Sequence, residues 1–212
     1  MKYDLYVITD EAIAGGQTHE EIARRAIAGG ADVIQLRDKV CGCRELCRIG
    51  RAIRTITMET GTLFLVNDRL DVALACGADG VHLGQDDIRV GTARQIAPPG
   101  FIIGVSVGTV DEAIRAEEEG ADYLALSPIF STDSKKDAGP GRGLEVLREI
   151  RQNVSVPVIA IGGINLDNVR EVIAAGANGV AVISVVVGSG DIVAAAWELK
   201  KKICESREAM RP

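Results

Sequence analysis

The sequence is poor in aromatic side chains and in histidine. Aromatic residues make up 3% of the 212 residues and there are two histidines, whereas glycine occurs 24 times. An antiparallel β-sandwich normally carries more aromatic residues in its strands. A zinc site built on histidine needs more ligands than this chain offers. The sequence also contains no P-loop and no serine nucleophile elbow, so chemistry that depends on those devices is excluded.

Long apolar runs are missing as well. The densest apolar stretch, residues 180–187, is far shorter than a membrane span of about 18 residues. No basic segment followed by an apolar one opens the chain, and five cysteines without such a signal favour a reducing, cytoplasmic location. A formal net charge of −6 excludes general attraction to nucleic acid or anionic membranes. The oligomeric state stays open, and a homo-oligomer is compatible with these properties.

A short turn recurs through the chain. Gly-Ala-Asp begins at residues 30, 77 and 120, and Gly-Ala-Asn begins at residue 176. Each copy follows a helix-like segment and precedes an aliphatic run. The glycine supplies a left-handed helix end, after which the chain turns into a strand. The intervals between the copies are long enough to hold two strand–helix units each.

Completing this pattern predicts eight strands that alternate with eight helices. The predicted strands are Leu5–Thr9, Val33–Arg37, Leu63–Val66, Gly80–Leu83, Ile102–Val105, Tyr123–Leu126, Val156–Ala160 and Gly179–Ile183. The predicted helices are Thr18–Ala28, Arg44–Thr60, Leu70–Ala75, Gly91–Ile96, Val110–Glu119, Gly143–Gln152, Leu166–Ala175 and Ile192–Glu205. The pattern is typical of an α/β fold, a (β/α)8 TIM barrel, as a single domain over residues 1–212. A doubly wound sheet is the alternative, but no G-x-G-x-x-G follows the first strand.

Two polar strings follow adjacent predicted strands. Asn67-Asp68 comes directly after the third strand, and His82 lies at the end of the fourth, which leads to Asp86-Asp87. The carboxyl ends of barrel strands share one face, so these carboxylates can meet at a single point. Such a meeting would suit a hard divalent cation, which prefers oxygen ligands. If they do not meet, they are ordinary loop acids.

Other strand ends carry groups that suit anions. Arg37, Lys39 and Lys135 form a positive cluster that would fit a diphosphate beside a metal ion. Lys135 by itself can equally be read as part of a solvated loop. The Gly162-Gly163 turn enters a predicted helix and could hold a phosphate, with a hydroxyl from Ser184. The same two glycines could also simply form a tight turn.

Taken together and in order, these strings resemble the thiamin phosphate synthase (thiamine-phosphate pyrophosphorylase) family. The resemblance covers nearly the whole chain. It rests on Gln35-Leu36-Arg37-Asp38-Lys39, Asn67-Asp68-Arg69, His82-Leu83-Gly84-Gln85-Asp86-Asp87, Gly104-Val105-Ser106, Ser127 to Asp137, Ile161-Gly162-Gly163-Ile164 and Val182-Ile183-Ser184. It implies a transferase that joins hydroxymethylpyrimidine diphosphate to a thiazole phosphate, or to its carboxylated form, and releases diphosphate.

The resemblance also implies roles for individual residues. Asp68 and Asp87 would ligate Mg²⁺, the implied cofactor. The diphosphate would be held by three cationic residues that support catalysis: Arg37, Lys39 and Lys135. The pyrimidine would be oriented by Gln35, Asn67 and Ser106. The thiazole phosphate would be held by Thr132, Ser134, Gly163, Ile183 and Ser184. The remaining members of the substrate-binding strings are Leu36, Asp38 and Asp133.

Two other functions remain possible at this point. A thiazole tautomerase-like paralogue shares the barrel and several strings, but it lacks the acidic pair equivalent to Asp86-Asp87. A non-catalytic barrel that binds phosphate could keep the pocket, although the metal pair argues against it. The glycine-rich segment 138–143 is expected to be a mobile loop over the diphosphate.

Overall fold

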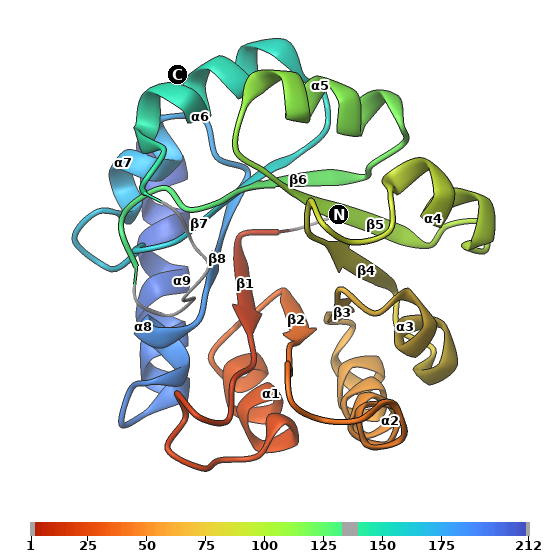
Figure 1. The fold of residues 1–212 in the computed structure, drawn as a ribbon. Coiled ribbons are helices and arrows are strands. Elements are labelled where there is room, and N and C mark those ends of the chain that lie inside the picture. The colour runs from red at the N-terminus through yellow and green to blue at the C-terminus, as the bar shows by residue number, and fades with distance from the viewer. Residues whose placement is uncertain (1–2, 133–139, 211–212) are drawn as a thin grey trace.

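Eight parallel strands close into a barrel in which each strand pairs with the next and β8 pairs with β1. This computed structural model describes residues 3–132 and 140–210, and its helices lie outside the ring of strands (Figure 1). The strands are β1 (Leu5–Ile8), β2 (Val33–Leu36), β3 (Leu63–Asn67), β4 (Gly80–Leu83), β5 (Ile102–Val107), β6 (Tyr123–Leu126), β7 (Val158–Ile161) and β8 (Gly179–Val182). The predicted (β/α)8 barrel is therefore confirmed.

The helices follow the predicted order, with one addition. They are α1 (His19–Ala28), α2 (Cys43–Thr60), α3 (Leu70–Cys76), α4 (Val90–Ile96), α5 (Val110–Glu118), α6 (Gly143–Asn153), α7 (Val169–Ala174), α8 (Ser184–Val187) and α9 (Ile192–Glu208). The additional element is the single turn α8, which follows β8 directly. Thr18 starts α1 with a capping box, because its side chain accepts from the Glu21 backbone while the Glu21 carboxylate accepts from the Thr18 backbone.

Several observed boundaries differ from the predicted ones by one to three residues, and two of these differences have a clear physical cause. The sequence places Pro157 inside the seventh strand, but β7 begins at Val158, since proline has no N–H to donate to a neighbouring strand. The Pro157 carbonyl still accepts from the backbone of Leu124, at 2.9 Å. Helix α7 begins at Val169 and not at Leu166. The side chains of Asn165 and Asn168 bond the backbone of this connection instead, which holds it as a turn.

The recurring Gly-Ala-Asp turns lie at the end of the barrel where the strands begin. Their Asp and Asn side chains accept hydrogen bonds from the backbone of the strand before, at the start of every odd-numbered strand. These bonds run from Leu5 to Asp32 (2.9 Å), Phe64 to Asp79 (2.8 Å), Ile103 to Asp122 (2.7 Å) and Val158 to Asn178 (2.8 Å). Each turn therefore ties two strands together, which explains why the motif recurs once for every two strand–helix units.

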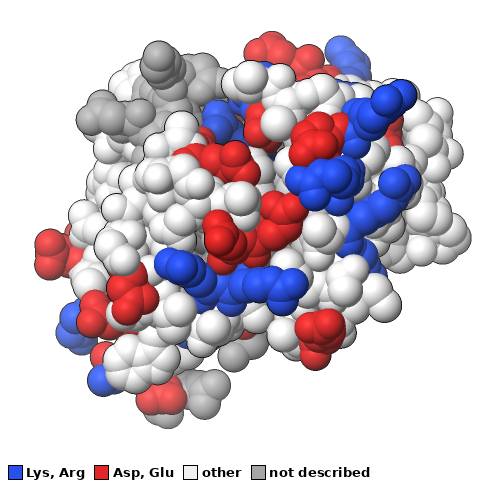
Figure 2. All heavy atoms as spheres, turned by 90° about the horizontal axis from the view of Figure 1, so that it is seen from below, with Lys and Arg blue, Asp and Glu red and all other residues white. Residues whose placement is uncertain are grey.

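The strands are almost completely buried, as expected of a parallel sheet covered on its outer face by helices. On the molecular face in Figure 2, acidic and basic side chains lie next to one another across the surface. Within the described ranges, every helix is too short or too polar to span a lipid bilayer.

Candidate active site

The two predicted metal ligands come together at the carboxyl ends of β3 and β4. These strands are neighbours, with Asn67 paired to His82. Asp68 has a φ of +62°, in the left-handed region, and its backbone N–H donates to the His82 carbonyl at 2.7 Å. Aspartate is one of the few residues that tolerate this conformation. The Asp87 carboxylate accepts from the Gly84 backbone at 2.7 Å, so both acids are held by the backbone around them.

The Asp68 carboxylate affects the ionisation of Asp87. Burial raises the pKa of Asp87, and the adjacent Asp68 carboxylate raises it further. The Gly84 hydrogen bond and the Lys39 charge oppose this rise in pKa. Lys39 Nζ lies 2.5 Å from Asp68 Oδ2. Two acids and one cation therefore share a single partly desolvated site.

The loop after β2 carries both predicted cations of that strand. The Arg37 guanidinium lies 3.1 Å from Asp10 Oδ2, and both side chains are mostly buried. Asp38 accepts from the backbone of Val40 and Cys41, at 2.7 and 2.8 Å. Although burial opposes the effect, these bonds hold the pKa of Asp38 below its usual range. The Asp38 carboxylate thus orders the loop that presents Lys39.

His19 also supports this loop, although the sequence indicated only that it lies at the start of a helix. His19 is buried, with Nδ1 2.7 Å from Thr9 Oγ1 and Nε2 3.3 Å from Asp38 Oδ2. Its role would be to support the loop rather than to contact a ligand. Only the folding of α1 against β2 brings these residues together, since 19 positions of sequence separate His19 from Asp38.

The two acids and the cations Arg37 and Lys39 line one hollow of about 300 Å³ at the end of the barrel, which we call the first hollow. Its walls are Arg37, Lys39, Asn67, Asp68, His82, Gly84, Gln85, Asp86, Asp87, Ser106, Ser127, Pro128 and Arg142. No cluster of three or more His, Cys, Asp or Glu side chains suited to a metal occurs among the described residues. Mg²⁺ commonly takes one or two protein carboxylates and completes its shell with water and substrate phosphate. The donor set of Asp68 and Asp87 fits that mode of binding.

Arg142 belongs to this hollow although the sequence did not single it out. Its side chain is exposed and its guanidinium packs against Gly108, where a Cβ would lie 2.9 Å from Nη2. Its backbone N–H donates to the Pro128 carbonyl at 2.8 Å. The only available signal was its place in the glycine-rich segment expected to form a loop.

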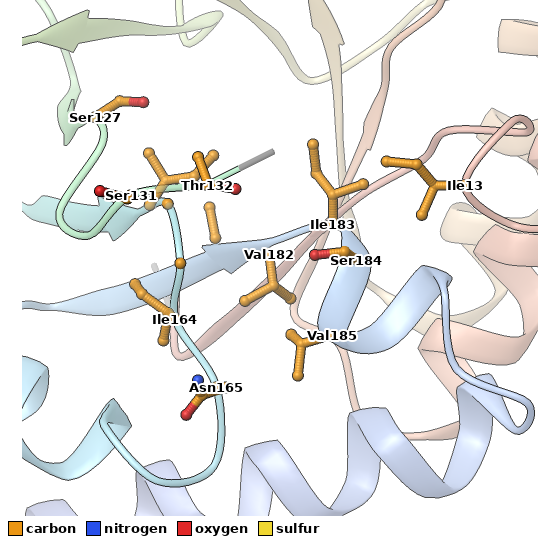
Figure 3. Close-up of a pocket in the computed structure, with 14 residues that line it drawn as sticks. Ile13, Ser127, Ser131, Thr132, Ile164, Asn165, Val182, Ile183, Ser184 and Val185 are labelled. Carbon is orange, nitrogen blue, oxygen red and sulfur yellow. The ribbon is translucent and has the colours of Figure 1, made fainter. Parts of the chain in front are cut away.

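A second, larger hollow of about 670 Å³ lies beside the first, and Ser127 lines both. It is formed by the segments that follow β6, β7 and β8 (Figure 3). Its lining includes the predicted residues Thr132, Gly163, Ile183 and Ser184. Ser131 and Thr132 come from the segment after β6, whereas Ser184 opens α8 on the opposite side of the cavity.

The Gly162-Gly163 turn at this hollow requires glycine. The φ angles are +103° and +64°. A Cβ on Gly162 would lie 2.5 Å from Pro128 Cβ, and one on Gly163 would lie 2.7 Å from Phe130 Cβ. The expected helix start directly after this turn is wrong, because α7 begins later. The helix that begins at the hollow is the single turn α8, at Ser184.

The remaining predicted residues divide into three groups. Gln35 is buried inside the barrel below the first hollow, where its Nε2 donates to the Tyr6 hydroxyl at 2.6 Å. The Leu36 side chain points outward towards Gly50 of α2, so a substrate could meet only its backbone. Asp133, Ser134 and Lys135 lie outside the described residues.

A sequence model of the family described as thiamine monophosphate synthase matches residues 5–186. The chain belongs to this family. It is 68% identical over 211 residues to a thiamine-phosphate synthase of Methanoregula boonei, covering 100% of this chain and 98% of the relative. It is 63% identical to the protein of the same name from Methanoculleus marisnigri, covering 98% of both chains. The family resemblance inferred from the sequence motifs is confirmed.

Solved structures agree with this assignment. A thiamine phosphate pyrophosphorylase from Pyrococcus furiosus superimposes with a TM-score of 0.89 at 46% identity, covering 96% of both chains. A 3-hexulose-6-phosphate synthase superimposes with a TM-score of 0.72 at 18% identity, covering 94% of this chain and 99% of that one. The second likeness shows the shared barrel fold alone. Membership of the thiamine monophosphate synthase family therefore rests on the first structure and on the sequence relatives.

Proposed function

We propose that this protein joins hydroxymethylpyrimidine diphosphate to thiazole phosphate in a Mg²⁺-dependent reaction that yields thiamin phosphate and diphosphate. The observation that carries the proposal is the meeting of Asp68 and Asp87 beside Lys39, in a hollow that adjoins a second one. The tautomerase-like alternative is less well supported, because that paralogue lacks the acidic pair equivalent to Asp86-Asp87. A family whose relatives are named thiamine-phosphate synthases provides the context.

The first hollow would take the pyrimidine diphosphate. Asp68 and Asp87 would hold Mg²⁺, which supplies positive charge to the departing diphosphate. Lys39 and Arg37 would bind the same group, and Lys135 would join them from outside the described residues. Asn67 lies at the end of β3 on the wall of this hollow. With Gln35 and Ser106, it would orient the pyrimidine.

The second hollow would take the thiazole phosphate. Thr132 and Ser184 offer hydroxyl groups, and Gly163 and Ile183 offer backbone, on the walls of this cavity. We assign Ser134 and Asp133 to the same site by their place in the family motif. Ile13, Val182 and Val185 give part of the cavity an apolar lining that suits the thiazole ring (Figure 3).

The arrangement explains how the reaction could proceed without a protein nucleophile. The bond between the pyrimidine methylene carbon and the diphosphate oxygen breaks, and its electron pair leaves with the diphosphate. The thiazole nitrogen then donates its lone pair to the methylene carbon. The protein contributes positive charge near the leaving oxygens and the alignment of two substrates. Because Ser127 lines both hollows, the two reacting groups can lie side by side.

The test is an assay with both substrates. Thiamin phosphate and diphosphate should form in equal amounts in the presence of Mg²⁺, and EDTA should stop their formation until Mg²⁺ is restored. Offering the carboxylated thiazole in parallel defines the accepted form of that substrate. If thiazole isomers interconvert while no diphosphate appears, the protein is a tautomerase. If both substrates bind without turnover, it is a binding protein.

We also propose that the protein works in the cytoplasm. All five cysteines carry free thiols in the structure, and free thiols persist where the environment is reducing. Fractionation of the source cells with an antibody against the protein tests this proposal. Recovery of the protein outside the cytoplasmic fraction would refute it.

A further inference from the structure

A chain of five polar side chains crosses the interior of the barrel beneath the first hollow. It begins at Gln35 on β2, whose Nε2 donates to the Tyr6 hydroxyl of β1 at 2.6 Å. The Tyr6 and Tyr123 hydroxyls lie 3.0 Å apart, although 117 positions separate them in the sequence. The Tyr123 hydroxyl lies 2.9 Å from His82 Nδ1, and His82 Nε2 lies 2.9 Å from Ser106 Oγ. The chain therefore connects two residues already assigned to pyrimidine binding.

The barrel is built to accommodate this chain. Tyr6 is 1% exposed, Tyr123 is 0% exposed and Gln35 is 1% exposed. The Tyr123 ring packs so tightly against Gly104 that a Cβ at that position would overlap it. The His82 and Tyr123 rings also stack, with centroids 5.7 Å apart. Among the atoms of this network, Gln35 Oε1 is buried without a hydrogen-bond partner in the described part of the structure. The other polar groups satisfy one another, which favours a unique arrangement of the core.

Counting the protons shows which group donates and which accepts in each hydrogen bond of this network. Burial raises the pKa of both Tyr6 and Tyr123, so each hydroxyl keeps its one proton at neutral pH. Tyr6 already accepts from Gln35 and is left to donate to Tyr123. Tyr123 is in turn left to donate to His82 Nδ1. A neutral imidazole that accepts at Nδ1 carries its proton on Nε2, which then donates to Ser106 Oγ.

We propose that Tyr123 is a positioning residue for the pyrimidine diphosphate. Its hydrogen bond to His82 Nδ1 keeps the imidazole proton on Nε2. Ser106, which accepts that proton's hydrogen bond, can then donate its own hydroxyl proton to an acceptor atom of the substrate. The inference rests on the function proposed above. Ser106 is half-buried and lines the first hollow, so its hydroxyl can reach a ligand there. If every hydrogen bond of the network ran in the opposite direction, Ser106 would instead donate its hydroxyl proton to His82 Nε2.

The first experiment observes the histidine directly. The protein has only two histidines, so ¹⁵N-histidine NMR of the substrate-free protein gives two rings to assign. A His82→Gln variant identifies the signals of His82. We expect a neutral His82 with its proton on Nε2. Gln35→Glu presents only acceptor oxygens to Tyr6 once its carboxyl group is ionised. At a pH high enough to ionise this buried group, the variant should reverse the hydrogen bonds and move the His82 proton to Nδ1. A wild-type ring protonated on Nδ1, or on both nitrogens, would overturn the proposal.

The second experiment compares two variants that each lose one hydroxyl from the chain. Tyr123→Phe removes the donor to His82, and kcat/KM for the pyrimidine diphosphate should fall about tenfold, the effect of one misdirected hydrogen bond. The KM for thiazole phosphate should stay unchanged. Tyr6→Phe leaves Tyr123 free to donate to His82, so this variant should keep the wild-type histidine spectrum and lose less activity.

Equal losses in the two variants, or an unchanged His82 spectrum in Tyr123→Phe, would reduce Tyr123 to a packing role. Circular dichroism and thermal unfolding check that both variants fold. The NMR measurement uses no substrate. Failure of the proposed reaction would therefore leave the direction of the chain testable, whereas a wrong direction would leave the reaction intact.

Discussion

Aspartates lie at both ends of this barrel, in opposite circumstances. At the end where strands begin, Asp79 accepts from the Phe64 backbone at 2.8 Å and pairs with Arg54 at 2.9 Å. At the end where strands finish, Asp87 accepts from a single backbone group and faces another carboxylate, Asp68. The first acid is fully compensated by its own fold. The second is only partly compensated, by the Gly84 backbone and the Lys39 charge.

The difference shows how one residue type serves two purposes on one scaffold. An acid that caps a strand stabilises the fold, and its charge is balanced by a nearby arginine or lysine. An acid that crowds another acid weakens the fold slightly, and under the proposed function it would serve to bind Mg²⁺. Parallel strands place these two kinds of site at opposite ends of the barrel, so substitutions at the two ends should separate stability from activity.

The largest expected effect is at Asp87. Asp87→Asn removes a proposed Mg²⁺ ligand and should lower kcat/KM by about a hundredfold or more, as expected when a group that stabilises developing charge is lost. Its thermal stability should not fall, because an amide relieves the repulsion from Asp68. The measurement is diphosphate release as a function of Mg²⁺ concentration. Asp86→Asn is the matched control, since Asp86 is exposed on the same loop; equal losses in both would refute the assignment.

At the other end, Asp79→Ala should lower the free energy of unfolding by about 2 kcal/mol, because the Phe64 N–H loses its acceptor. The kinetic constants of the remaining folded protein should not change. Asp79→Asn is the control, since Asn178 plays the same part at Val158 with an amide oxygen. The free energy of unfolding of this variant should fall by only about 0.5 kcal/mol, because only the ion pair with Arg54 is lost. Urea unfolding and initial rates measure the two quantities, and a loss of kcat at this end would break the comparison.

Arg142 tests how far the anion site extends. Arg142→Gln should raise the KM for the pyrimidine diphosphate by about fivefold, the size expected of an exposed charge pair, and leave the KM for thiazole phosphate unchanged. Arg148→Gln is the control, because Arg148 is an exposed arginine of the same helix region that pairs with Glu145. A rise in the other KM would move Arg142 to the second hollow.

The smallest expected effect is on the pH dependence of stability. Burial and the Asp68 charge raise the pKa of Asp87 above its ordinary value of 3.8. The folded protein therefore holds the proton more tightly than the unfolded chain, and stability without metal should fall as the pH rises from 3.8 through the folded pKa. Thermal unfolding in EDTA should show this fall, and Asp87→Asn should remove it. A pH profile that is the same in both proteins would place the raised pKa elsewhere.

Much of the fold could be predicted because its signals are local. The Gly-Ala-Asp turns mark the starts of alternate strands, and the buried strands are short aliphatic runs between them. The predictions were wrong where a neighbouring segment decides the outcome. Pro157 lies outside β7 because it has no N–H, and Asn165 and Asn168 hold a turn where the sequence reads as helix.

The residues of the candidate site likewise fall into those that local sequence predicts and those that it does not. Asp68, Asp87 and Lys39 could be found because each lies in the short segment after a strand, and strand ends converge in any barrel. His19 and Tyr123 could not be found, because their contacts with Asp38 and His82 join segments far apart in the chain. Arg142 reaches the first hollow only because Gly108 leaves room for its guanidinium.

The sequence by itself determined the barrel, the family and the acids that would meet a metal, because periodic burial, turn chemistry and motif order are properties of neighbouring residues. The tertiary structure decided what each polar group faces. It set the capping partners of the strand-start aspartates, the crowding of Asp87 by Asp68, and the path from Gln35 to Ser106. Those relations depend on strand register and on the distance across the barrel, and neither is encoded within a single segment.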